Sequence, residues 1–237
     1  MCLKRITNMI IETMGRRRAT SYTSALLHME GTDVSRDFID ETGKIWTNVG
    51  EWIYLFTGYK KFGISSLACL SSSYITTPYN SYFNLINSDF TIDFWMRDYD
   101  NKGTDREIFS KGYHSSASNE FIFYSRVYNQ SNRSQFLVYD SNGTTSYSFF
   151  SSIDTNSKYP NFYHVAVVRY SDIITIYIDG VSGGSMNVSG YILANYGSNV
   201  DIGYDNTASA FVDEFRISNI ARWTSNFTPP TSAYTLD

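Results

Sequence analysis

The alternation of apolar and polar side chains predicts β-strands from about residue 25 onward. In SDFTIDFWMR (88–97) every second side chain is apolar, from Phe90 to Met96, which is typical of a strand with one buried face. FYHVAVVRY (162–170) is apolar on both faces, and this pattern indicates a central strand that is covered on both sides. Before residue 25 the apolar residues instead recur at helical spacing.

Several shorter stretches of the same kind predict further strands, separated by loops rich in Ser, Asn, Gly and Thr. Many short strands with regular turn signals, and no long helical segment, indicate an antiparallel β-sandwich or jelly roll. We therefore expect an all-β protein with one domain at 25–237. The further predicted strands are ALLHM (25–29), REIFS (106–110), EFIFYSR (120–126), QFLVYD (135–140), IITIYIDG (173–180), VDIGY (200–204) and FVDEFRI (211–217).

Composition agrees with an all-β fold. Aromatic residues make up 17% of the chain and charged residues only 18%, and aromatic side chains favour strands. The two cysteines, Cys2 and Cys69, form no CxxC pattern, so no disulfide framework is expected. No apolar run approaches the roughly 18 residues of a membrane span.

The first 24 residues form a basic arm. Residues 1–20 contain five Lys and Arg residues against Glu12 alone, a net charge of +4, so the remaining residues carry −8 and the whole chain −4. Such asymmetry is typical of an interaction tail, and the helical spacing predicts either a docking helix for other proteins or a leader without a role. The arm lacks the apolar stretch and cleavage site of a signal peptide. One Arg triplet beside an acidic body does not favour nucleic-acid binding.

The sequence offers little for catalysis. Asp213 and Glu214 are neighbours, so on a regular strand they would point to opposite faces and could not act as a pair. An E-x-D-x-E run, which would place two carboxylates on one face as glycoside hydrolysis requires, is absent. His28, His114 and His164 have neither a G-x-S-x-G elbow nor zinc-binding spacing. We therefore expect no enzyme activity, and an endoglycanase-type hydrolase is disfavoured.

A structural calcium ion is one interpretation of the acids at the start and end of the chain. Calcium needs carboxylates and carbonyls gathered from loops. Glu30 and Asp33 lie in one acidic loop, and Asp213 would be their neighbour if the first and last strands pair. The alternative is that these acids cap turns by accepting backbone N–H groups.

Five segments together resemble a laminin-G-like, concanavalin A-like jelly roll of the kind found in phage and other viral virion proteins. The resemblance implies that the D-E-x-R-I strand closes the sandwich beside the first strand, that Arg216 pairs with one of the adjacent acids, and that Trp223 and Phe227 cover the sandwich edge. It also implies a core of Phe211, Phe215 and Ile217, with Val212 nearer the opposite face. The segments are LLHMEGTD (26–33), KKFGISSLACLSSSYITTP (60–78), SDFTIDFWMR (88–97), FYHVAVVRYSDIITIYIDGV (162–181) and IGYDNTASAFVDEFRISNIARWTSNFTPP (202–230).

The resemblance implies a non-enzymatic binding module, often for glycans. Sugar binding uses aromatic rings for the apolar sugar face and polar groups for the hydroxyls, and several loops supply both. We therefore expect a virion-associated, lectin-like protein at a virion or extracellular surface, binding a glycan or host-surface ligand and contacting other virion proteins through its arm. A structural decoration, tail or capsid subunit, which could form a homo-oligomer, is the alternative. The candidate ligand-binding residues are Tyr113, Tyr124, Tyr128, Tyr147, Tyr204 and Asn206.

Overall fold

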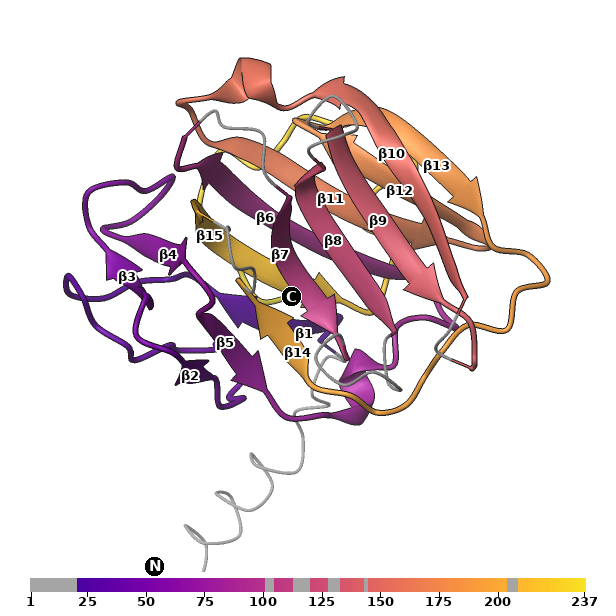
Figure 1. Ribbon diagram of the computed structural model, residues 1–237, viewed down its shortest axis with the longest axis horizontal. Coiled ribbons are helices and arrows are strands. Elements are labelled where there is room, and N and C mark those ends of the chain that lie inside the picture. Colours follow the sequence, from indigo (N-terminus) through magenta and orange to yellow (C-terminus); the bar gives the residue numbers. More distant parts are fainter. Residues whose placement is uncertain (1–20, 101–104, 113–119, 128–132, 143–144, 204–208) are drawn as a thin grey trace, which may run out of the picture.

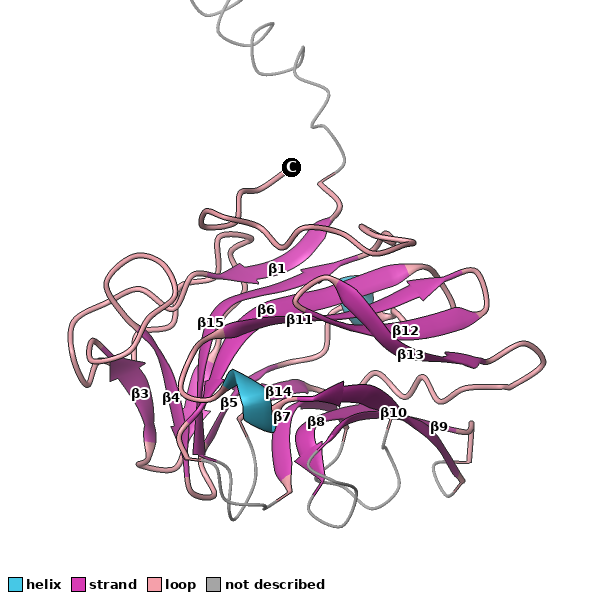
Figure 2. Ribbon diagram, turned by 90° about the horizontal axis from the view of Figure 1, so that it is seen from above, coloured by secondary structure: helices cyan, strands magenta, loops and turns pink. Residues whose placement is uncertain are grey.

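Two antiparallel β-sheets pack face to face, as the alternating pattern predicts (Figures 1 and 2). The structure is a computed structural model, and it describes residues 21–100, 105–112, 120–127, 133–142, 145–203 and 209–237. Residues 1–20 of the basic arm lie outside the described residues, and the expected domain boundary at residue 24 falls within the first strand. Among the residues that the structure describes, no helix is long and apolar enough to cross a membrane.

One sheet has eight strands and contains the two strands that the sequence shows most clearly. The last strand pairs with β6 along one side, and with β4 and then β1 along the other. Its pairing with β1 confirms that the chain closes beside its first strand. The order is β13 (Val181–Asn187), β12 (Ile173–Ile178), β11 (Tyr163–Tyr170), β6 (Phe90–Asp98), β15 (Ser209–Ser218), β4 (Ser66–Leu70) and β3 (Ile53–Phe56), with β1 (Thr23–Leu27) beside β15.

The second sheet has seven strands and lies below the first in Figure 2. Two short 3₁₀ turns, η1 (Ser81–Phe83) and η3 (Asn156–Lys158), precede β6 and β11. The order of strands is β10 (Ser146–Asp154), β9 (Arg133–Tyr139), β8 (Phe121–Val127), β7 (Arg106–Lys111), β14 (Val200–Ile202), β5 (Tyr74–Thr77) and β2 (Thr47–Val49).

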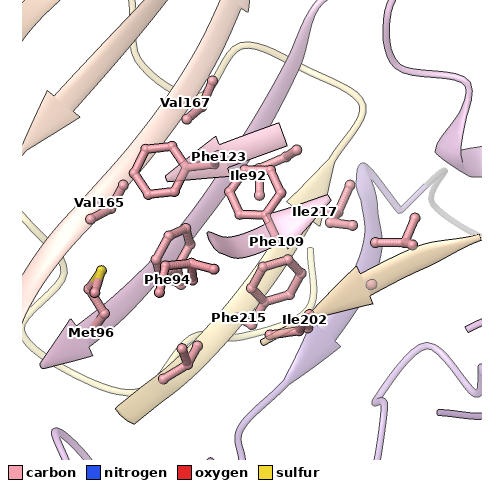
Figure 3. Close-up of a cluster of buried hydrophobic side chains, with 14 of the residues drawn as sticks. Ile92, Phe94, Met96, Phe109, Phe123, Val165, Val167, Ile202, Phe215 and Ile217 are labelled. Atoms are coloured by element: carbon pink, nitrogen blue, oxygen red, sulfur yellow. The ribbon is translucent and has the colours of Figure 1, made fainter. Parts of the chain in front are cut away.

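The main core fills the space between the two sheets with aromatic and branched side chains (Figure 3). Phe94 of β6 stacks on Phe215 of β15 with ring centroids 5.8 Å apart, and Phe109 stacks on Phe123 in the other sheet at 5.4 Å. Such aromatic pairs add specific geometry to the burial of apolar area, which is the dominant favourable term in folding. The predicted inward face of β6 is confirmed, because the side chains from Phe90 to Met96 at every second position are fully buried here.

A second buried layer covers the outer face of the eight-stranded sheet. Trp95 of β6 packs there with Tyr234 of the C-terminal segment and with Phe62 of the β3–β4 connection. Trp223 and Phe227 stack on each other with centroids 3.9 Å apart, and they pack on the sheet face beside Tyr177 rather than at the sandwich edge. This outer layer explains why β11 is apolar on both faces. Figure 2 shows the C-terminus on the outer side of the eight-stranded sheet.

A β-bulge in β15 overturns two of the expectations about this strand. The register shifts between Asp213 and Arg216, and Glu214 adopts a positive φ of 54°. The extra residue reverses the alternation, so Val212 joins the main core with Phe215, and Phe211 packs on the outer face instead. The bulge also places both acids on the outer side, since Asp213 binds the β3–β4 connection and Glu214 binds His28.

Arg216 pairs with Asp93, not with either of the adjacent acids. Its Nε and Nη2 donate to the two carboxylate oxygens at 3.0 and 2.8 Å, and Asp93 is fully buried. This arginine holds the pKa of Asp93 below its usual value despite burial of the carboxyl group, which acts in the opposite direction. His164 is buried beside the pair, with its Nε2 2.9 Å from the Tyr234 hydroxyl.

Candidate ligand-binding pocket

The three acids that the sequence suggests as calcium ligands hold one loop in place. This loop, residues 57–64 between β3 and β4, is clamped at three points along its length. Asp33 accepts a hydrogen bond from the backbone N–H of Thr57 at 3.0 Å, and Glu30 accepts from the N–H of Ile64 at 2.9 Å. Asp213 accepts from two consecutive N–H groups between them, those of Lys61 at 2.6 Å and Phe62 at 3.1 Å.

Asp213 is the central point of this clamp and is fully buried. Burial raises its pKa to about 7, although the two backbone N–H groups act in the opposite direction. Its Oδ1 is buried without a hydrogen-bond partner among the described residues. One unpartnered oxygen does not make a calcium cage, and no group of three or more His, Cys, Asp and Glu side chains in the described part of the chain could hold a metal ion. In the described residues these three acids cap backbone N–H groups of the loop, and calcium binding stays a prediction.

The clamped loop forms one wall of an open pocket of about 400 Å³. The opposite wall is the connection that leads into β11, and Arg97 near the end of β6 lies between the two walls. We call this site the Arg97 pocket. It is lined by Gly58, Tyr59, Lys60, Lys61, Arg97, Pro160, Asn161 and Phe162.

Arg97 is fixed by its neighbours although no carboxylate neutralises it among the described residues. Only 8% of the residue is exposed. Its guanidinium carbon lies 3.8 Å from the centroid of the Tyr59 ring, its Nε donates to the Pro160 carbonyl at 2.7 Å, and its Nη1 reaches the Asp98 carbonyl at 3.3 Å. Within the described residues Nη2 makes no hydrogen bond, so the planar donor fork has one nitrogen without a protein acceptor.

Two lysines add to the positive charge of the Arg97 pocket. Lys61 places its Nζ 3.8 Å from the centroid of the Trp95 ring, and the exposed Lys60 donates to the Thr57 carbonyl at 3.1 Å. Neither forms an ion pair with a described carboxylate. Tyr59 is 41% exposed, and Asn161 adds an amide at the opposite wall. The pocket therefore combines an aromatic surface, an amide and three cations.

The candidate sugar-binding residues do not come together in the described structure. Four of them, Tyr113, Tyr128, Tyr204 and Asn206, lie outside the described residues. Tyr147 packs against the main core and stacks on Tyr191 with centroids 4.1 Å apart. Tyr124 follows the core residue Phe123 on β8, so it points to the outer face of the seven-stranded sheet. The two described tyrosines thus lie on opposite faces of that sheet, and neither of them lines the Arg97 pocket.

The sequence contains only a weak signal for the Arg97 pocket. Tyr59, Lys60 and Lys61 are consecutive, but Arg97 and Asn161 join them only because β6 and β11 are neighbours in the sheet. Alternation identifies Arg97 as outward-facing and gives no indication of what covers it. A signal that could have been used is the run of two lysines between aromatic residues in a loop.

A smaller cleft of about 190 Å³ lies elsewhere on the outer face of the eight-stranded sheet. It has an aromatic wall and hydroxyl groups but no cation in its lining, so its chemistry suits a neutral ligand. It is lined by Val168, Tyr170, Ile173, Thr175, Tyr177, Trp223 and Thr224.

The two sheets and the loop-bounded pocket define a jelly-roll module of the concanavalin A-like class. The chain belongs to the concanavalin A-like lectin/glucanases superfamily, because a laminin-G family model with that description matches residues 70–225, more than half of the chain. The family resemblance seen in the sequence is thereby confirmed. No curated protein sequence matches the chain.

Similar solved structures are receptor-binding domains of clostridial toxins. The binding domain of Paraclostridial Mosquitocidal Protein 1 superposes with a TM-score of 0.63 at 17% identity, over 84% of this chain and 49% of that one. The binding domain of botulinum neurotoxin DC has a TM-score of 0.65 at 15% identity in its complex with SialylT, over 84% and 48% of the two chains. Its complex with rat synaptotagmin II gives 0.66 at 15% identity, over 84% and 49%. At this identity the likeness concerns the fold, and the chain spans about half the length of these domains.

Proposed function

We propose that this protein is a non-enzymatic, lectin-like module that binds a glycan on a cell or particle surface through the Arg97 pocket. The observation that carries the proposal is the pocket itself, in which Tyr59, which is 41% exposed, Asn161 and Arg97 line one open volume. Sugars offer an apolar ring face and a rim of hydroxyl groups, and these are the groups that such a lining contacts.

Among the described residues no carboxylate lines the Arg97 pocket, which supports binding rather than hydrolysis. Glycoside hydrolysis requires two carboxyl groups on either side of the scissile bond. Asp213 and Glu30 are engaged by backbone N–H groups of the clamped loop, and Asp93 is engaged by Arg216. The similar toxin structures are also binding domains, and two of them are complexes, one with SialylT and one with synaptotagmin II.

The location that we propose is a virion or extracellular surface, with the basic arm contacting other virion proteins. Support for this comes from the charge asymmetry between residues 1–20 and the remainder of the chain. The alternative is an assembly subunit, which two adjacent exposed isoleucines favour. Ile39 and Ile45 face each other across a β-bridge and are 68% and 75% exposed.

A glycan panel tests the proposed function directly. The full 237-residue chain is applied to immobilised neutral and acidic glycans, together with a variant in which Tyr59→Ala removes the exposed ring. Saturable binding to a defined sugar class, weakened about tenfold in the variant, is the expected result, since aromatic contacts of this size carry about 1–3 kcal/mol. Binding to no glycan would favour the assembly role, as would strong self-association that Ile45→Ser abolishes.

A further inference from the structure

The Arg97 pocket contains more positive charge than a neutral sugar requires. Three cationic side chains line it, and none of them has a carboxylate partner among the described residues. Elsewhere in the described structure buried cations are neutralised, as Arg106 is by Asp98 and Lys111 is by Glu120. The positive charge of the pocket is therefore a local feature of a domain that is acidic as a whole.

Arg97 has the geometry of a receptor for a planar or tetrahedral anion. Stacking on Tyr59 and the bond to the Pro160 carbonyl fix the plane of the guanidinium, so little side-chain freedom is lost when a ligand binds. Its free Nη2 can donate to an oxygen of a carboxylate or sulfate, and the ammonium groups of Lys60 and Lys61 can approach the same anion from the loop. Charge-assisted hydrogen bonds of this kind are roughly twice as strong as neutral ones.

We propose that the Arg97 pocket binds an acidic sugar unit, with its carboxylate or sulfate group against Arg97 and the lysines and its ring against Tyr59. This inference rests on the proposed glycan-binding function and specifies the class of glycan. The aromatic ring and the Asn161 amide distinguish the pocket from a simple phosphate site, because an inorganic anion has no ring face for Tyr59 to contact. The second cleft, which has no cation in its lining, is the natural site for any neutral sugar.

The test compares matched pairs of ligands that differ only in charge. Sialyllactose is compared with lactose, and a sulfated lactosamine with the unsulfated form, by titration calorimetry on the full chain. We expect one acidic ligand to bind about tenfold or more tightly than its neutral partner, which is what one charge-assisted contact supplies. The pair that shows the preference identifies the anion as a carboxylate or a sulfate.

The variants locate the effect at the pocket. Lys60→Gln removes an exposed cation with little risk to folding, and Arg97→Lys keeps the charge but removes the planar fork. Arg36→Gln is the matched control, because Arg36 is an exposed cation outside the pocket lining. The acidic ligand should bind about five- to tenfold more weakly to both pocket variants and unchanged to the control.

Other outcomes would overturn the inference and are distinguishable from failure of the proposed function. Equal binding of acidic and neutral partners, or equal loss in Arg36→Gln, would leave a lectin without an acidic subsite. If Trp223→Ala were the only variant that lost neutral sugar binding, the sugar site would lie in the second cleft and not in the Arg97 pocket. Absence of binding to every glycan, with or without binding to anionic phosphatidylserine vesicles, would remove the proposed function as well.

Discussion

Burial makes the ionised form of the Asp213 side chain unfavourable in the folded chain. Its pKa rises from 3.8 to about 7 because the carboxyl group is removed from water. A carboxyl group with a raised pKa destabilises the folded state once the unfolded state ionises. The penalty is therefore absent below about pH 3.8, grows as the pH rises, and is complete above about pH 7.

Substitution Asp213→Asn tests this assignment. The asparagine Oδ1 can still accept the N–H groups of Lys61 and Phe62, but the side chain does not ionise. We expect the melting temperature of the parent to fall relative to that of the variant between about pH 4 and pH 8. Thermal unfolding over this range measures the difference. Parallel pH profiles for the two proteins would show that Asp213 ionises normally.

Arg216 and Asp93 form a buried ion pair, and breaking it should lower the free energy of unfolding. Arg216→Met leaves the carboxylate of Asp93 buried without its main partner, and such changes cost about 3–5 kcal/mol. The double variant Asp93→Leu/Arg216→Met removes both charges and should recover a large part of this loss. Urea denaturation of the two single variants and the double variant gives the coupling energy. Additive losses would mean that the pair contributes little.

The clamped loop at 57–64 depends on a glycine at one position. Gly63 has a φ of +56°, and a Cβ at this position would lie 1.6 Å from Oε1 of Glu30. Gly63→Ala should therefore push the Glu30 carboxylate away from the N–H of Ile64, release that point of the clamp, lower the free energy of unfolding by roughly 1–3 kcal/mol and weaken ligand binding at the Arg97 pocket.

Gly43→Ala is the matched control for this element. Gly43 also has a positive φ, +82°, but a Cβ added there would have no atom within 4 Å. It should show only the backbone penalty, roughly 1 kcal/mol, and unchanged binding. Equal effects of the two substitutions on binding would show that the contact with Glu30 does not position the loop.

Strands with a strong pattern were predictable from the sequence, and strands without one were not. The predicted strands at 88–97 and 162–170 correspond to β6 and β11. The short strands β2 to β5 were not predicted, and neither were β10 and β13, in which Ser and Gly interrupt the alternation. The faces of β15 were assigned wrongly because a bulge reverses the alternation at Glu214. The Arg97 pocket was not predictable, since its residues come from three segments that only the sheet order brings together.

The calcium ion expected from the sequence stays a prediction. An ion that binds only the folded chain raises its melting temperature. Because the backbone N–H groups of the loop engage Glu30, Asp33 and Asp213, the geometry favours a melting temperature that is the same with EDTA and with calcium. A rise of several degrees with calcium that Asp213→Ala abolishes would establish the ion.

The molecule combines a negative net charge with a local cationic pocket. A screened attraction between the pocket and an acidic glycan should weaken as salt is added, because the Debye length falls from about 10 Å at 0.1 M to about 3 Å at 1 M. Long-range attraction by the domain as a whole is not expected, since residues beyond the arm carry a net negative charge. Discrimination between glycans must then come from contacts inside the pocket.

The most direct test of a glycan site at the Arg97 pocket is binding of the full chain to a panel of neutral and acidic glycans, with Lys60→Gln and Arg36→Gln measured in parallel. We predict saturable binding to acidic glycans that Lys60→Gln weakens and Arg36→Gln leaves unchanged. Binding to no glycan, or binding that both substitutions leave intact, would contradict the assignment of a glycan site to the Arg97 pocket.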